Sequence, residues 1–223
     1  MNRILKTDFT LLCKKRKMVF LYALLIFSIM LYCRVYSKID GEGLFEIFNT
    51  ITLLYFVIGF IFLKGELFEK NIIRYYLESE KKRYNIIIAF YIEHILIYLL
   101  CNTLFLGIIY ILGYKVNLNS TLKYLLIHIV IYFLYITIVM NIILHFKQTG
   151  TSVTISLILL WGIPNLINFI CYDKWFYRIQ IFYYLSPNSF FGSEHIIQDI
   201  GIAMAYSLIL MMLSAKRFQV LEF

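Results

Sequence analysis

Six continuous apolar stretches, each about long enough to cross a lipid bilayer, constrain this chain more than any other feature. They cover residues 18–36, 44–63, 86–112, 122–144, 153–170 and 196–213. A helix needs ~20 residues to cross the hydrocarbon core, whereas a membrane β-barrel needs ~10-residue segments that alternate between apolar and polar. The whole chain holds only two prolines and ten glycines to interrupt helices. The sequence therefore predicts an all-α integral membrane protein with six transmembrane helices in a single transmembrane domain, residues 1–223.

Composition supports the same fold class and excludes a soluble one. Hydrophobic residues make up 61% of the chain, charged residues 15%, and the mean hydropathy is +0.79. A soluble domain has ~45–50% apolar and ~25% charged residues, and its limited interior could not hide so much apolar surface. The net charge of +8 would suit nucleic-acid binding only if it formed a basic face. The basic residues instead form short clusters between apolar stretches, so we expect a lipid bilayer and no nucleic acid as the partner.

The distribution of basic residues predicts the orientation in the membrane. If the N-terminus lies inside, fifteen of the 21 Lys and Arg residues fall in inner segments and six in outer segments. Cytoplasmic loops carry an excess of Lys and Arg, and the opposite topology would invert the ratio. We therefore expect a multi-pass protein of the bacterial cell membrane with both termini in the cytoplasm.

Three connecting segments have patterns of their own. Residues 2–17 combine basic residues with apolar residues at helical spacing, which favours an N-terminal interfacial helix over a disordered basic tail. In the inner connection 64–85, the apolar positions 68, 72, 73, 76 and 77 fit one helical face, and no helix breaker follows Gly65. The outer connection 171–195 is rich in Tyr, Trp and Phe, which prefer the headgroup level. It predicts either a re-entrant hairpin before the last span or an ordinary outer loop.

The chain lacks the common catalytic motifs. It contains no phosphate-binding G-x-x-x-x-G-K-[ST] loop, no G-x-G-x-x-G, no H-E-x-x-H and no G-x-S-x-G. Glu93 and His94 are adjacent on a predicted helix and so point about 100° apart, which is a poor metal pair. The four cysteines have no C-x-x-C spacing. We expect no enzyme activity, no metal and no cofactor in this chain.

Glu93 lies inside the third predicted span, where an ionised carboxylate costs a few kcal/mol. Two interpretations stay open. Glu93 is either a substrate-path or gating residue, or a packing residue paired with another helix or with water at the inner face.

The arrangement of these segments resembles the ABC type-2 permeases, which are membrane subunits of ATP-binding-cassette transporters. In that family a basic interfacial helix precedes span one, a cytoplasmic coupling helix joins spans two and three, and an aromatic re-entrant hairpin precedes span six. Residues 2–17, 66–83 and 172–195 occupy those places. Tyr76-Leu77 followed by Ser79 to Arg83 looks like the family's coupling segment, with Glu78-Ser79-Glu80 in place of its proline. Leu185-Ser186-Pro187 is similar to the family's Leu-x-Pro.

The resemblance implies partners and site residues. A separate ATPase subunit would carry ATP and Mg, and a second permease subunit would complete a homodimer or heterodimer. The residues implied to couple to the ATPase are Glu66, Glu69, Arg74, Leu77, Glu78 and Arg83. Spans two and five would line the translocation path, with Asn49, Thr52, Phe56, Phe60, Glu93, Trp161 and Asn165 as candidates. This mixture of rings and small polar groups suits an amphipathic cargo, such as an antimicrobial or toxin-like peptide.

Two other classes of function stay open on the sequence. One is an intramembrane enzyme, either a protease or a lipid-modifying protein, although Glu80 to Arg83 does not match the Glu-Glu-x-x-x-Arg pattern of some such proteases. The other is an immunity membrane protein that binds a toxin without transporting it. A neighbouring ATPase would distinguish the permease from both.

Overall fold

The computed structural model describes residues 41–79, 83–111, 113–115, 117–171, 180–185 and 195–221. Every regular element within these residues is helical. In chain order they are α3 (Gly41–Glu69), α4 (Ile73–Ser79), α5 (Arg83–Ile111), α6 (Leu118–Phe146), α7 (Thr149–Leu157), the π-helix η1 (Ile158–Gly162), α8 (Ile163–Cys171), the 3-10 helix η2 (Ile181–Leu185) and α10 (Ile196–Val220).

Five helices in the described part of the chain are long and apolar enough to cross a membrane. They are Gly43–Glu69, Arg83–Ile111, Leu118–Phe146, Thr149–Cys171 and Ile196–Val220. The shortest has 23 residues, which at ~1.5 Å per residue exceeds the ~30 Å hydrocarbon core. The last five predicted spans are thus confirmed as helices of spanning length. Most ends extend a few residues beyond the predicted ones, except that α5 ends at Ile111 and α10 starts at the predicted Ile196. The predicted span 18–36, the interfacial helix 2–17 and most of the hairpin 172–195 lie outside the described residues.

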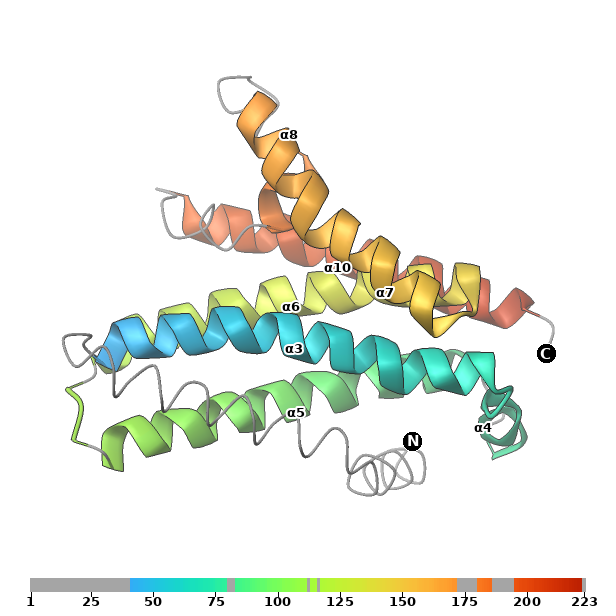
Figure 1. Cartoon of the computed structure of the whole chain (residues 1–223), viewed down its shortest axis with the longest axis horizontal. Coiled ribbons are helices and arrows are strands. Elements are labelled where there is room, and N and C mark those ends of the chain that lie inside the picture. The colour runs from blue at the N-terminus through green and yellow to red at the C-terminus, as the bar shows by residue number, and fades with distance from the viewer. Residues whose placement is uncertain are drawn as a thin grey trace.

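The long helices form a bundle around α6 (Figure 1). Helix α6 contacts α3, α5, α7 and α10, and it is the most deeply buried of the spanning helices. Helix α7 starts beside the end of α3, and the same span continues through η1 into α8, which leans away from α3 and α6 (Figure 1). The described part of the chain therefore combines a packed group, α3, α5, α6 and α10, with a span that leaves it at one end.

Aromatic rings hold α3, α5 and α6 of the packed group together. The rings of Tyr98 on α5 and Tyr132 on α6 stack with centroids 4.4 Å apart. Phe56 of α3 meets both edge-on, at 5.2 Å from Tyr98 and 6.0 Å from Tyr132. Such pairs contribute ~0.5–1.5 kcal/mol beyond their buried area. One aromatic cluster thus fixes three helices relative to one another.

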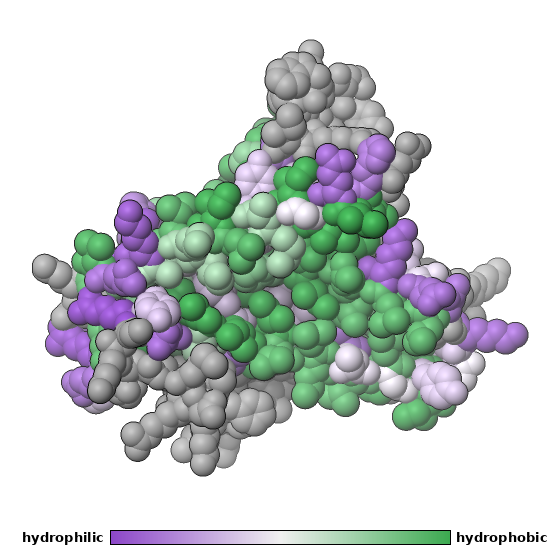
Figure 2. Space-filling model, turned by 180° about the vertical axis from the view of Figure 1, so that it is seen from behind, coloured by the Kyte–Doolittle hydropathy of each residue, from purple (hydrophilic) through white to green (hydrophobic). Residues whose placement is uncertain are grey.

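The surface follows the pattern of a protein in a bilayer. Figure 2 shows a broad apolar band across one face, with hydrophilic residues gathered towards its two ends. Large apolar side chains lie exposed on α5 and α8, among them Leu100, Leu104, Leu166 and Phe169. Many large apolar side chains exposed on one face are unusual on soluble monomers, whereas lipid accommodates them without cost.

Candidate functional site

The candidate site is the end of the bundle where α3 gives way to α4, here called the α3–α4 end. Helix α3 ends at Glu69, and the chain turns through Asn71, whose φ is +54°. Asparagine is one of the few residues that adopt this left-handed conformation readily. The amide of Asn71 donates to the carbonyl of Phe68 at 3.2 Å and closes the turn, and α4 begins at Ile73.

The predicted coupling helix over 66–83 is therefore wrong in its bounds. Residues 66–69 are the last turn of α3, and the separate helix α4 covers only Ile73–Ser79 before the chain enters α5 at Arg83. The apolar spacing across this segment spans two helices and the turn at Asn71, so it did not reveal the break.

Helix α4 turns its apolar face towards its own bundle. Ile73 and Tyr76 are buried, and the Tyr76 ring meets Phe90 of α5 edge-on at 5.9 Å. Leu77 is half-buried against the same core. These apolar side chains are consequently engaged within the chain, and a partner docking here would not meet them first.

The opposite face of α4 is open and carries charge. Arg74 and Glu78 are exposed, and Tyr75 between them is 73% exposed. Of the predicted coupling residues, Arg74 and Glu78 are the two that a partner can reach directly on α4. Tyr75 was not among the predicted residues, although exposed tyrosines are enriched at protein–protein interfaces.

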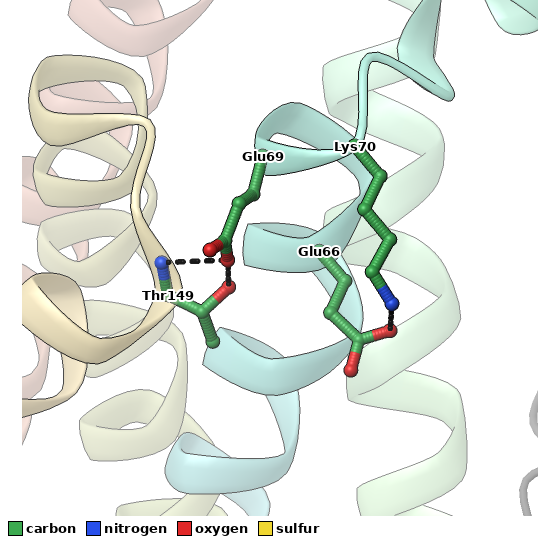
Figure 3. A network of polar contacts seen from close by, with 4 residues as sticks. All are labelled: Glu66, Glu69, Lys70 and Thr149. Carbon is green, nitrogen blue, oxygen red and sulfur yellow. Dashed lines mark hydrogen bonds and ion pairs between the residues drawn. The ribbon is translucent and has the colours of Figure 1, made fainter.

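The other predicted coupling residues make contacts within the chain. Glu66 in the last turn of α3 and Lys70, the first residue after α3, form an exposed ion pair at 3.5 Å (Figure 3). The carboxylate of Glu69 points instead to α7, where it accepts hydrogen bonds from Thr149 (Figure 3). Arg83 donates to the carbonyls of Gln219 and Leu221 at 3.1 and 2.9 Å, which fixes the end of α10 beside the start of α5. This end of the bundle is therefore held together by polar contacts from several helices.

A buried ion pair lies deeper in the bundle, between α3 and α5. Lys64 Nζ is 2.7 Å from Glu93 Oε2, and their side chains are only 3% and 4% exposed. The ammonium also lies 4.1 Å from the centroid of the Phe90 ring, a cation–π contact. The pairing favours the second interpretation of Glu93, in which the carboxylate packs against a charge on another helix.

His94 extends this polar group. It is 3% exposed, its ring meets Phe60 edge-on at 4.7 Å, and its Nε2 has no hydrogen-bond partner among the described residues. The described residues contain no group of three His, Cys, Asp or Glu side chains that could hold a metal ion.

Apart from Glu93, the predicted path residues fall into two groups that the structure does not bring together. Asn49, Thr52, Phe56 and Phe60 of α3 are at most 2% exposed and fill the core facing α5 and α6. The amide of Asn49 donates to the carbonyl of Phe45, and the hydroxyl of Thr52 donates to that of Phe48, so both polar groups are satisfied inside the bundle. In this conformation these four residues pack within the bundle, and their assignment along a path stays a prediction.

The two remaining candidates lie on the span that leaves the bundle. Trp161 of η1 is half-buried and meets Tyr135 of α6 edge-on at 5.3 Å. Asn165 of α8 is exposed, and its amide donates to the Trp161 carbonyl at 2.8 Å. An amide on an outward-facing part of a membrane span is more consistent with a protein or water neighbour than with lipid.

A further buried acid lies at the opposite end of the bundle. Asp199 in the first turn of α10 is 3% exposed and lies near Tyr184 of η2. Burial raises the pKa of the Tyr184 phenol, and the Asp199 carboxylate raises it further. Burial and the neighbouring Asp199 carboxylate thus both favour the protonated form of the Tyr184 phenol, which suits a structural contact between η2 and α10.

Sequence reasoning missed two partners, Lys64 and Thr149. Lys64 counted only as one of the inner basic residues, although an opposite charge in the next span is a signal for a buried pair. Thr149 had no distinguishing signal, because its partner Glu69 is 80 residues away in sequence.

No protein-family model and no curated protein matches the chain. Over the described residues, the fold and its surface define the class: a helical protein with multiple helices long and apolar enough to cross a membrane.

Proposed function

We propose that this chain is the membrane-spanning permease subunit of an ATP-binding-cassette transporter and exports an amphipathic peptide or a related hydrophobic cargo. It works with a separate ATPase subunit, which binds ATP and Mg, and with a second permease subunit. It lies in the bacterial cell membrane with both termini and the α3–α4 end in the cytoplasm.

The observation that carries this proposal is the geometry of α4. A short helix follows a long apolar helix, packs its apolar face on the bundle through Ile73 and Tyr76, and presents Arg74, Tyr75 and Glu78 outwards. Its inner face anchors it to the spans, and its outer face offers two opposite charges around an aromatic ring. An ATPase that docks on such a platform can pass force to the spans, and complementary charges would fix the register of docking.

The charge distribution supports the orientation. Among the described residues, the α3–α4 end carries Lys70, Arg74, Arg83, Lys147, Lys216 and Arg217, whereas the opposite end carries Lys115 and Lys123. The excess of basic residues at the end with α4 favours a cytoplasmic location.

The position of α8 supports a path between two subunits. Phe56 and Phe60 are enclosed in the core, but Asn165 is exposed on a helix that leans away from the bundle (Figure 1). In a pair of permeases, Trp161 and Asn165 would face the cargo or the second subunit.

Affinity purification tests the proposal. The tagged chain, extracted from its native membrane in mild detergent, should retain an ATPase with a phosphate-binding loop, identified by mass spectrometry. The double reversal Arg74→Glu/Glu78→Lys should abolish this retention, because both charges of the exposed face change sign. Lys115→Glu, at the opposite end, is the matched control and should retain the ATPase. If the wild-type chain retains no ATPase, the permease assignment is wrong.

A further inference from the structure

The start of α7 is capped by a side chain from another helix. One carboxylate oxygen of Glu69, Oε2, accepts a hydrogen bond from the backbone amide of Thr149 at 3.2 Å and a second from the Thr149 hydroxyl (Figure 3). Glu69 is the last residue of α3, and Thr149 is the first residue of α7. The contact therefore joins the end of one spanning helix to the beginning of another.

Helix α7 has a need for such a cap. Its own N-cap residue, Gln148, makes no side-chain capping hydrogen bond, and Lys147 before it adopts a left-handed conformation that ends α6. The first amides of a helix lack partners within it, and a carboxylate there also interacts favourably with the helix dipole. Glu69 of α3 supplies the capping acceptor for α7 that Gln148 does not provide.

Gly65 brings the two backbones into contact one turn earlier on the same face of α3. A Cβ atom at position 65 would lie 3.0 Å from the Thr149 hydroxyl oxygen and 3.4 Å from both its Cα and Cβ atoms. Glycine fits here without strain, whereas a larger residue would have to push the Thr149 hydroxyl aside by a few tenths of an ångström. Gly65 and Glu69 thus hold Thr149 by close packing and by hydrogen bonding.

This contact lies between α4 and the span that leaves the bundle. Only residues 70–72 separate Glu69 from α4, and the helix that begins at Thr149 continues through η1 and α8 to Cys171. A displacement of α4 would therefore reach the end of α3 directly, and the Thr149 contact would carry it to the start of that span.

We infer that Gly65, Glu69 and Thr149 form a joint that transmits movement of α4 to the span Thr149–Cys171. The inference rests on the proposed function and changes the role of one residue in it. Glu69 is a positioning residue within the permease, and the charges that meet the ATPase are those of Arg74 and Glu78.

Disulfide trapping tests the geometry without any ATPase. In a background whose four native cysteines are replaced by serine, Gly65→Cys/Thr149→Cys should cross-link under mild oxidation, because the 3.4 Å separation of the Cβ positions approaches the ~3.5–4.5 Å of disulfides. Glu66→Cys/Thr149→Cys is the matched control and should not, since position 66 points about 100° away from position 65. Equal cross-linking of both pairs would overturn the geometry of the joint.

Rescue by the cross-link tests the transmission. The readout is ATP hydrolysis by the co-purified complex, compared with the ATPase alone. Adding Glu69→Ala to the Gly65→Cys/Thr149→Cys pair should lower stimulated hydrolysis about fivefold or more in the reduced protein, within the usual range of coupling between sites. Oxidation should restore it, because the disulfide replaces the lost hydrogen bonds. Thr149→Val should reduce stimulation while Thr149→Ser keeps it.

The outcomes separate this inference from the proposed function. In one outcome the wild-type chain stimulates the ATPase, Thr149→Val and Thr149→Ser stimulate it equally, and oxidation does not change the rate of ATP hydrolysis. The joint then does not transmit movement, and the permease assignment stands. If the wild-type chain neither retains nor stimulates an ATPase, both fail together. The Thr149→Val variant should retain the ATPase but stimulate it less. This result would show that the joint acts after the ATPase has docked.

Discussion

Two polar contacts on α3, five residues apart, hold it to different neighbours in different ways. Lys64 pairs with Glu93 of α5 inside the bundle, with both side chains almost fully buried. The exposed carboxylate of Glu69 meets Thr149 of α7 in a partly buried contact at the α3–α4 end. A buried charge cannot leave its partner without losing several kcal/mol, whereas a carboxylate with access to water can exchange its partner for solvent. The first contact suits a fixed attachment, and the second suits a joint that must respond to a partner.

The largest effect should come from breaking the buried pair on one side. Lys64→Met removes the ammonium and leaves Glu93 in the core, and we expect it to destabilise the protein by about 3–5 kcal/mol. Unfolding of the purified protein in detergent micelles measures this. The double variant Lys64→Met/Glu93→Leu should recover most of the loss, because no charge is then left buried. A double variant as unstable as the single one would show that the pair itself supplies the stability.

A smaller effect should come from crowding the joint. Gly65→Ala places a methyl group against Thr149, and we expect it to destabilise the protein by about 1–2 kcal/mol through overpacking. Gly201→Ala in α10 is the matched control, because nothing lies within 4 Å of its Cβ position. The control should be neutral or slightly stabilising, since alanine is the better helix former. The same unfolding measurement compares the two, and equal behaviour would mean that α3 and α7 are not in close contact.

The smallest effect should come from the exposed ion pair at the end of α3. Glu66 and Lys70 are 3.5 Å apart with side chains 32% and 61% exposed. Glu66→Gln should change stability by no more than about 0.5 kcal/mol, because solvent screens such pairs. It should also leave ATPase stimulation unchanged. A large loss of stimulation in this variant would move the docking surface from α4 to the last turn of α3.

The sequence predicted the spanning helices well because their signal is local and repeated over ~20 residues. The same kind of signal failed over residues 66–83, where the chain breaks at Asn71 with a positive φ that apolar spacing does not encode. The pattern on span two did identify the interior face of α3, since Asn49, Thr52, Phe56 and Phe60 do share one buried side. The pattern could not distinguish a face packed in the core from a face that lines a translocation path, because both can carry hydrogen-bonded polar groups.

The contacts that define the candidate site are long-range, which explains why sequence reasoning found only one member of each. Glu93 was identified but not its partner Lys64, and Glu69 was identified but not Thr149. The relevant pairings are 29 and 80 residues apart and depend on how α5 and α7 pack against α3. A single sequence carries the chemistry of each residue but not the packing that joins them.

Labelling of a single cysteine on α4 tests the central claim most directly. In the cysteine-free background, Glu78→Cys lies on the exposed face of α4, and Lys115→Cys lies at the opposite end of the bundle. In intact cells, a membrane-impermeant maleimide should label Lys115→Cys and leave Glu78→Cys unlabelled, because the α3–α4 end faces the cytoplasm. Both should react after permeabilisation. Labelling of Glu78→Cys from outside intact cells would place α4 on the wrong side of the membrane for an ATPase and contradict the account.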